Sequence, residues 1–139
     1  MRQHQERLVL SPAGAGLHEF TRELAAAVGR SGIHTGLCHV FLRHTSASLL
    51  IQENADPSAR RDLERWFDRL VPEGDPLYRH TAEGPDDMPS HLKAALTSVS
   101  ELMPIVEGSL GLGTWQGIYL FEHRRRPGKR ELIVHMWGE

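Results

Sequence analysis

The chain has 139 residues, of which 40% are hydrophobic and 24% charged, and its formal net charge at pH 7 is −2. This length predicts one domain over residues 1–139, and the apolar content excludes a disordered chain. No long apolar run is present, so we expect neither a membrane span nor a secretory signal. The balanced charge predicts no nucleic-acid partner. A lone cysteine, Cys38, forms no internal disulfide, which favours a cytoplasmic location.

The first third of the chain shows the alternation of apolar residues that is typical of strands and the spacing that is typical of helices. Alternating side chains predict a strand over residues 5–11, and apolar residues at helical spacing predict a helix from residue 17 to about 29. Two more alternating runs, residues 36–44 and 47–53, predict strands. The link between these two strands is so short that it requires a bulge or a bend.

The middle of the chain is expected to hold two helices and a long loop. Asp56 can cap a helix that Pro57 starts. Residues 72–89 then contain four prolines and two glycines, and a loop of this length in a small domain is either functional or mobile. A further helix is predicted from about Asp86 or Asp87, which places His91 near its N-terminus.

Two strands are expected to end the chain, over residues 113–123 and 130–137, joined by a turn in RRRPGK. We interpret the basic residues around this turn as a solvated hairpin end, because no aromatic side chains for base stacking lie among them. At least five strands and three helices, without a βαβ rhythm, predict an antiparallel α+β fold.

Residues whose side chains can take part in catalysis or ligand binding form three groups that are separated in the sequence. They are His44, Thr45, Ser46 and Ser48; Glu53, Asn54 and Asp56; and His80, Glu83, Asp86, Asp87 and His91. Imidazoles and carboxylates from different loops can surround a divalent cation. A helix N-terminus also favours the neutral imidazole that binds a metal or accepts a proton.

Each of these residues also has a purely structural interpretation. His44 could be hydrogen-bonded at the edge of the core, His80 could be solvated in its loop, and His91 could cap or pack locally. Asp56 is more typical of a helix cap than of a catalyst. The hydroxyl side chains could bind phosphate oxygens or reflect strand propensity alone. Glu53 ends an apolar row, so that its carboxylate either reaches solvent or meets a cation.

Three segments together resemble the YjbQ family: HTSASLLIQENADPSARRDLE, YRHTAEGPDDMPSHLKAAL and LGLGTWQGIYLFEHR. The resemblance covers nearly the whole chain. It implies an α+β fold built on a distorted antiparallel β-sandwich with flanking helices, a homotrimer, and a polar pocket that can hold a metal. Some members of the family carry the name secondary thiamine-phosphate synthase.

The matched motifs fall on residues 44–48, 53–57, 78–80, 83–93 and 113–116. From these we predict a divalent metal, zinc or magnesium, as cofactor. The predicted metal ligands are His44, His80 and His91, and the predicted catalytic acid/base groups are Glu53 and Asp86. The predicted substrate-binding residues are Thr45, Ser46, Ser48, Asn54, Lys93 and Gln116.

The leading hypothesis is a metal-assisted enzyme that acts on a phosphorylated small molecule. The resemblance suggests a thiamine-phosphate synthase, which joins hydroxymethylpyrimidine diphosphate to thiazole phosphate and releases pyrophosphate; the metal would stabilise the negative charge of the leaving group. The alternative is a trimer that binds a phosphorylated metabolite without turnover, and product formation separates the two. Nucleic-acid binding through the basic turn ranks last.

Overall fold

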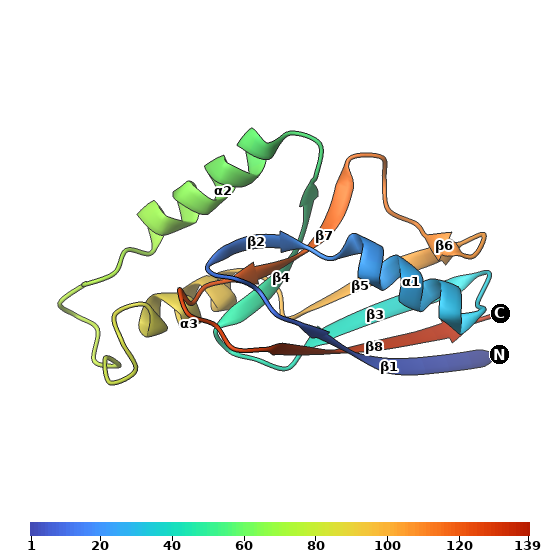
Figure 1. Cartoon of the computed structure of the whole chain (residues 1–139), viewed down its shortest axis with the longest axis horizontal. Helices are drawn as coiled ribbons and strands as arrows, with labels where there is room; N and C mark the ends of the chain where they lie inside the picture. Colours follow the sequence, from blue (N-terminus) through green and yellow to red (C-terminus); the bar gives the residue numbers. More distant parts are fainter.

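The computed structural model describes residues 1–139 and contains eight strands and three helices (Figure 1). In chain order they are β1 (Arg2–Leu10), β2 (Gly16–Glu19), α1 (Thr21–Ser31), β3 (Gly36–Leu42), β4 (Ala47–Glu53), α2 (Pro57–Leu70), α3 (Asp87–Leu96), β5 (Ser100–Val106), β6 (Ser109–Leu110), β7 (Gln116–Glu122) and β8 (Arg130–Gly138). The strands form a five-stranded sheet of order β1-β8-β3-β5-β6 and a three-stranded sheet of order β2-β7-β4. Every strand pairing is antiparallel.

The three-stranded sheet is covered on both faces. Along β7, Leu120 belongs to a core of 17 buried residues that also includes Val40 of β3 and Leu24 of α1. Its neighbour Phe121 points the other way and packs with Phe67 of α2 in a smaller apolar cluster. The fold is therefore α+β, consistent with the predicted distorted sandwich and flanking helices. None of the helices has the length and apolar character that a membrane crossing requires.

Two parts of the secondary structure differ from the sequence-based prediction. Leu17 lies in the short strand β2, and the helix begins only at Thr21. Strand β5 was not predicted, because Pro104 interrupts it and because its outward-facing Leu102 is apolar, which blurs the alternation. Pro104 is tolerated there because β6 pairs only with Ile105 and Val106.

The predicted hairpin at the end of the chain is also wrong. Strands β7 and β8 lie in different sheets, so that residues 123–129 cross from one sheet to the other. Residues 43–46 make a similar crossing from β3 to β4, which is the bend that the short link required. Contacts between Arg130 and both His44 and Ser46 hold the two crossings side by side. This junction lies next to α3 and supports the candidate site.

Candidate metal centre

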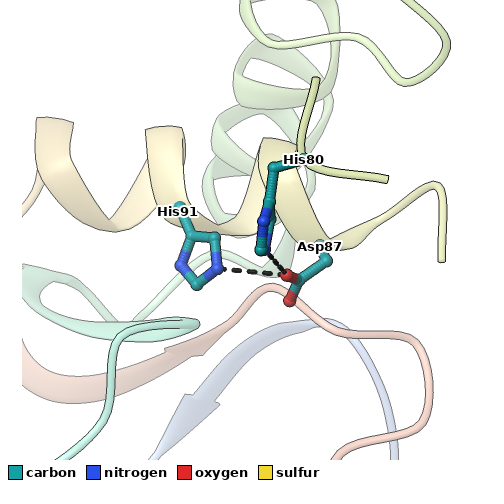
Figure 2. Close-up of side chains that lie close together, drawn as sticks. All are labelled: His80, Asp87 and His91. Atoms are coloured by element: carbon teal, nitrogen blue, oxygen red, sulfur yellow. Dashed lines mark hydrogen bonds and ion pairs between the residues drawn. The ribbon is translucent and has the colours of Figure 1, made fainter. Parts of the chain in front are cut away.

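Three potential ligands meet at the start of α3 (Figure 2). His80 Nε2 lies 2.6 Å from Asp87 Oδ2, and His91 Nε2 lies 3.1 Å from the same oxygen. One ligand atom from each residue lies within 4.8 Å of the others. We call these three residues the metal cluster. Two of its members, His80 and His91, are predicted ligands.

Helix α3 supplies two members of the metal cluster, because Asp87 and His91 are four residues apart and therefore share one face of the helix. His80 comes from the long loop between α2 and α3. Gly84 lies where this loop returns to the helix and has a φ of +106°, a conformation that L side chains rarely adopt. The loop that the sequence predicted to be functional or mobile thus provides one candidate ligand.

A backbone carbonyl contacts one nitrogen of the His91 ring. His91 Nδ1 lies 2.9 Å from the carbonyl oxygen of Thr45. Because a carbonyl only accepts hydrogen bonds, Nδ1 carries a hydrogen in this contact. Nε2, the other ring nitrogen, faces the Asp87 carboxylate. In metal-binding histidines the nitrogen that does not bind the metal typically donates to a carbonyl or carboxylate, as Nδ1 does here.

The Asp87 carboxylate is almost fully buried, with 1% of the residue exposed. Its Oδ1 accepts a hydrogen bond of 2.5 Å from the Arg124 guanidinium, while Oδ2 faces the two imidazoles. Burial is the largest single influence and raises the pKa of Asp87. The hydrogen bond from His80 and the charges of His91 and Arg124 together outweigh it, so the net pKa is lowered. Asp87 is therefore held as a carboxylate.

The donor set of the metal cluster fits a divalent transition metal. The Thr45 carbonyl engages His91 Nδ1, so Nε2, 3.1 Å from Asp87 Oδ2, is the ring nitrogen left for a cation. A cation would satisfy both atoms and the His80 ring as well. Two imidazole nitrogens and one carboxylate oxygen are a familiar zinc-binding combination, whereas magnesium prefers oxygen ligands.

Pockets open on several sides of the metal cluster. A pocket of about 410 Å³ is lined by His80, Tyr78 and Thr81 of the long loop. A second, of about 300 Å³, is lined by His91, His44 and small apolar side chains of α3. A third, of about 370 Å³, lies over the start of α3 and is lined by Asp86 together with Arg124, Arg125 and Arg126. Small molecules could therefore approach from either imidazole.

The third predicted ligand, His44, lies outside the metal cluster. The backbone N–H of Glu131 donates a hydrogen bond of 2.8 Å to His44 Nε2, and the Arg130 guanidinium lies 3.3 Å from Nδ1. Burial and then the charge of Arg130 lower the pKa of His44. Both ring nitrogens therefore face donors from this chain. His44 still lines a pocket together with His91, so the two rings are neighbours.

Most of the predicted substrate-binding side chains nearest to the metal cluster are engaged within the chain, except that of Thr45. Thr45 contributes its carbonyl to His91, and Ser46 Oγ accepts a hydrogen bond of 2.9 Å from Arg130. Ser48 is buried against His123, with Ser48 Oγ 2.9 Å from His123 Nε2. Lys93 forms an ion pair of 2.6 Å with Asp68.

Asp86, a predicted acid/base group, binds the crossing segment. Its Oδ2 accepts a backbone hydrogen bond of 3.0 Å from Arg125 and lies 3.3 Å from Arg124 Nε. Burial raises the pKa of Asp86, but these hydrogen bonds and the charge of Arg124 more than reverse the effect. The structure thus holds Asp86 ionised beside the metal cluster.

A buried histidine lies behind the cluster. His123 is 5% exposed, and its Nδ1 has no hydrogen-bond partner. Burial and then the charges of Lys93 and Arg130 lower the pKa of His123 to about 3. The ring is therefore neutral at ordinary pH.

The remaining predicted site residues lie at the opposite end of β4. Glu53 ends this strand, where its Oε2 is buried without a partner. Asn54 Nδ2 donates to Glu19 at 3.0 Å, and Gln116 Oε1 accepts the backbone N–H of Gly113 at 2.8 Å. Because β4 rises by about 3.3 Å per residue, its Glu53 end lies roughly 20 Å from its Ala47 end, which is the end near the Thr45 contact with His91.

Sequence reasoning missed three residues of the candidate site and its support. Asp87 was grouped with the histidines but not chosen as a ligand, although its spacing of four from His91 on a predicted helix is a recognisable signal. Arg124 was assigned to a solvated turn, but its guanidinium binds Asp87, Asp86 and the carbonyl of Glu83. Arg130, assigned to the same turn, is only 7% exposed. No local pattern distinguishes these arginines from their neighbours.

Comparison with known proteins gives consistent matches over nearly the full length. The family described as UPF0047 protein YjbQ-like matches residues 6–139. A UPF0047 protein of Synechocystis is 59% identical over 99% of this chain and 94% of its own length. A solved structure from Thermus thermophilus, a conserved hypothetical protein, is 36% identical with a TM-score of 0.83, covering 93% of this chain and 97% of the other. A YjbQ/UPF0047 family protein of Clostridium acetobutylicum is also 36% identical, with a TM-score of 0.82 over 96% of this chain and 99% of its own.

Proposed function

This chain belongs to the UPF0047 family of YjbQ-like proteins, and we propose that it is a metal-assisted enzyme acting on a phosphorylated small molecule. The observation that carries the proposal is the convergence of His80 Nε2, His91 Nε2 and Asp87 Oδ2. Three protein ligands with an open position are the usual arrangement of a catalytic zinc site. Between the two predicted metals, this donor set supports zinc over magnesium.

The surroundings of the metal cluster support an anionic substrate. Arg124, Arg125 and Arg126 line one pocket beside it, and Arg126 takes part in no ion pair of this chain. Arginine guanidinium groups match phosphate oxygens in geometry and charge. We place the phosphoryl group of the substrate in this pocket, and the uncharged part in the pocket of about 410 Å³ that His80 and Tyr78 line.

The proposed division of labour follows from the contacts. A bound zinc ion would act as a Lewis acid that stabilises developing negative charge on a phosphoryl oxygen. Asp87 and the two imidazoles hold the ion. Arg124 binds Asp87 and faces the arginine-lined pocket, so that it orients both the ligand and the anion. Asp86, whose Oδ2 binds Arg124 and the Arg125 N–H, would hold these residues beside the anion, whereas Glu53 lies too far away within one subunit.

The specific reaction that we propose is that of a thiamine-phosphate synthase. It joins hydroxymethylpyrimidine diphosphate to thiazole phosphate and releases pyrophosphate, whose charge the cation and the arginines would stabilise. The alternative is a regulatory protein that binds a phosphorylated metabolite without turnover. Both use the same pocket, and only product formation distinguishes them.

Assembly and location complete the proposal. We propose a homotrimer, supported by the uncovered apolar residues on the outer face of the five-stranded sheet, among which Phe41 and Leu102 are 43% and 54% exposed. Such a row marks an interaction surface. A trimer could bring Glu53 of one subunit near the metal cluster of another. A cytoplasmic location stays a prediction that rests on the lone Cys38.

The decisive test measures metal and turnover in the same samples. Purified protein is saturated with zinc, desalted and analysed for metal by mass spectrometry, and then incubated with isotopically labelled hydroxymethylpyrimidine diphosphate and thiazole phosphate. We expect about one zinc per chain, and labelled thiamine phosphate as product. The His91→Ala variant should lose both while light scattering still reports a trimer. Saturable binding of both compounds with no product under any divalent metal would favour the regulatory alternative. Wild-type protein without bound zinc would overturn the metal proposal.

A further inference from the structure

We propose that the buried ion pair between Glu122 and Arg130 is the positioning element of the metal cluster. Through Arg130 it holds the Thr45 carbonyl that accepts a hydrogen bond from His91 Nδ1, and through the backbone of Arg124 it holds the guanidinium that binds Asp87. This inference rests on the proposed metal site, but its first consequence, the hydrogen on His91 Nδ1, can be observed in metal-free protein.

The first step concerns residues 43–46, which cross between the sheets. No strand or helix includes these residues, so their shape depends on contacts with other elements. The Thr45 carbonyl must nevertheless lie within hydrogen-bond distance of His91 Nδ1 if that nitrogen is to carry the hydrogen. A displacement of about 1 Å would break this bond, because N–H···O bonds extend only to about 3.2 Å.

Arg130 and Glu131 hold residues 43–46 on both sides of Thr45. On one side, Arg130 Nη2 donates to Ser46 Oγ at 2.9 Å and to the Ser46 carbonyl at 3.3 Å. On the other, the Glu131 N–H donates to His44 Nε2 at 2.8 Å. Thr45 is therefore fixed between two residues that the start of β8 holds. His44, in this view, is a support of the ligand His91.

Glu122 fixes Arg130 and extends the support to the other side of the cluster. Its two carboxylate oxygens accept hydrogen bonds from Arg130 Nε and Nη2, each 2.6 Å long. Oε2 also accepts the backbone N–H groups of His123 and Arg124, both at 3.1 Å. Arg124 in turn binds Asp87 Oδ1. One carboxylate thus connects both the His91 and the Asp87 sides of the cluster.

Stability alone is a weak reason to bury this pair. Glu122 is 1% exposed and Arg130 7%, and removing two such charges from water costs free energy that their attraction often only balances. Apolar residues of similar volume are frequently as stable. What apolar residues cannot do is accept two backbone N–H groups and donate to Ser46 and His44 at the same time. These contacts hold the segments that carry Thr45 and Arg124, the partners of His91 and Asp87 in the metal cluster.

The test uses the Arg130→Lys variant, which keeps the charge but loses the planar fork. Its matched control is Arg43→Lys, because Arg43 is the neighbouring arginine of the same crossing and forms an ion pair of 3.0 Å with Glu131 that is 46% exposed on the arginine side. The readout is the ¹⁵N chemical shifts of the His91 ring in labelled, metal-free protein, followed by zinc affinity in competition with a chromophoric chelator.

We expect wild type and Arg43→Lys to carry hydrogen on Nδ1 of His91, where the Thr45 carbonyl accepts it, and Arg130→Lys to show a partial loss of hydrogen from that nitrogen. Zinc affinity should fall about 10- to 100-fold in Arg130→Lys, the usual effect of losing a partner that orients a ligand. It should stay within about twofold in the control. Unchanged hydrogen on His91 Nδ1 together with wild-type zinc affinity in Arg130→Lys would overturn the proposal.

A milder variant guards against simple unfolding. Ser46→Ala removes one acceptor of Arg130 and leaves the ion pair intact, so we expect the same changes at smaller size; an unaltered ring and unaltered affinity would again count against the proposal. The two proposals fail in different ways. If wild-type protein carries hydrogen on His91 Nδ1 but binds no zinc, the proposed function fails; if it binds zinc and Arg130→Lys changes nothing, the positioning role fails.

Discussion

The two ends of strand β4 carry the two halves of the predicted site, and they are built differently. At the Ala47 end, polar contacts join residues that are 84 to 88 positions apart, such as Arg130 with Ser46 and Glu131 with Arg43. At the Glu53 end, a local cap, in which Asp56 Oδ1 accepts the N–H of Ser58 at 2.9 Å, lies beside longer contacts from Asn54 to Glu19 and from the Tyr119 hydroxyl to the Glu53 carbonyl. The first end brings three potential metal ligands together, whereas the second holds one carboxylate, that of Glu53, with a buried oxygen that has no partner. Motifs that are close in sequence can therefore serve different purposes.

The largest expected effect tests whether residues near the Ala47 end of β4 bind the metal without those at the Glu53 end. The Asp87→Asn variant should lose at least about 100-fold in zinc affinity, because the third ligand loses its charge and the partly buried Arg124 loses one of its two counter-ions. The Glu53→Gln variant should bind zinc within about twofold of wild type. Isothermal titration with zinc measures both. Equal losses in the two variants would show that both ends contribute to one site, as they could across a subunit boundary.

The second prediction concerns pH and the buried His123. Because its pKa is lowered from 6.5 to about 3, the unfolded chain binds a proton near pH 5 that the folded chain does not. Stability should therefore fall as the pH decreases below 6.5, by about 1.4 kcal/mol per pH unit for this group. In His123→Gln this contribution is absent.

Urea unfolding at pH 7 and pH 5 provides the measurement. The loss of unfolding free energy between the two pH values should be smaller in His123→Gln than in wild type by about 2 kcal/mol. His44, whose pKa is also lowered, contributes equally in both proteins and cancels. An identical pH dependence would mean that His123 is protonated in the folded protein.

The third prediction tests the second end of β4. Gln116→Ala removes the acceptor for the Gly113 N–H, an exposed hydrogen bond that contributes up to about 1 kcal/mol. We expect a small decrease in the urea midpoint and no change in zinc affinity. A clear loss of zinc would place Gln116 in the site in spite of its distance along β4.

The smallest effect separates the side chain of Thr45 from its backbone. Thr45→Ala removes the hydroxyl, which forms no hydrogen bond in this structure, but keeps the carbonyl that His91 requires. Zinc affinity should stay within about twofold of wild type, measured by the same titration. If binding of the phosphorylated substrates weakens while zinc binding does not, the predicted substrate role of the Thr45 side chain gains support.

Most of the fold could be predicted from the sequence, because the patterns of residues that indicate strands and helices are local. Alternation identified β4, and the Asp56–Pro57 pair marked the start of α2. It failed at β5, where Pro104 and outward apolar residues hide the alternation, and at the chain end, where a turn signal was interpreted as a hairpin although the strands separate into two sheets. A turn residue specifies the local bend but not the sheet that each strand joins.

The candidate site was predictable only in part. The loop and helix that carry His80 and His91 could be recognised, because a long proline-rich loop and the acidic residues at the start of α3 leave local signals. The spacing of Asp87 from His91 is also visible in the sequence, but the contact of Arg124 with Asp87 and the burial of Arg130 are not, since they depend on which side chains a sheet crossing covers. Solvated and buried arginines look identical in a basic run.

The crossing of β7 to β8 also has a consequence for biosynthesis. Arg130, which bonds Ser46 beside Thr45, lies 39 residues after His91 in the chain. During translation, the long loop and α3, with His80 and His91, therefore emerge before the arginine that holds the neighbour of Thr45. The geometry of the site would be complete only once β8 has docked between β1 and β3.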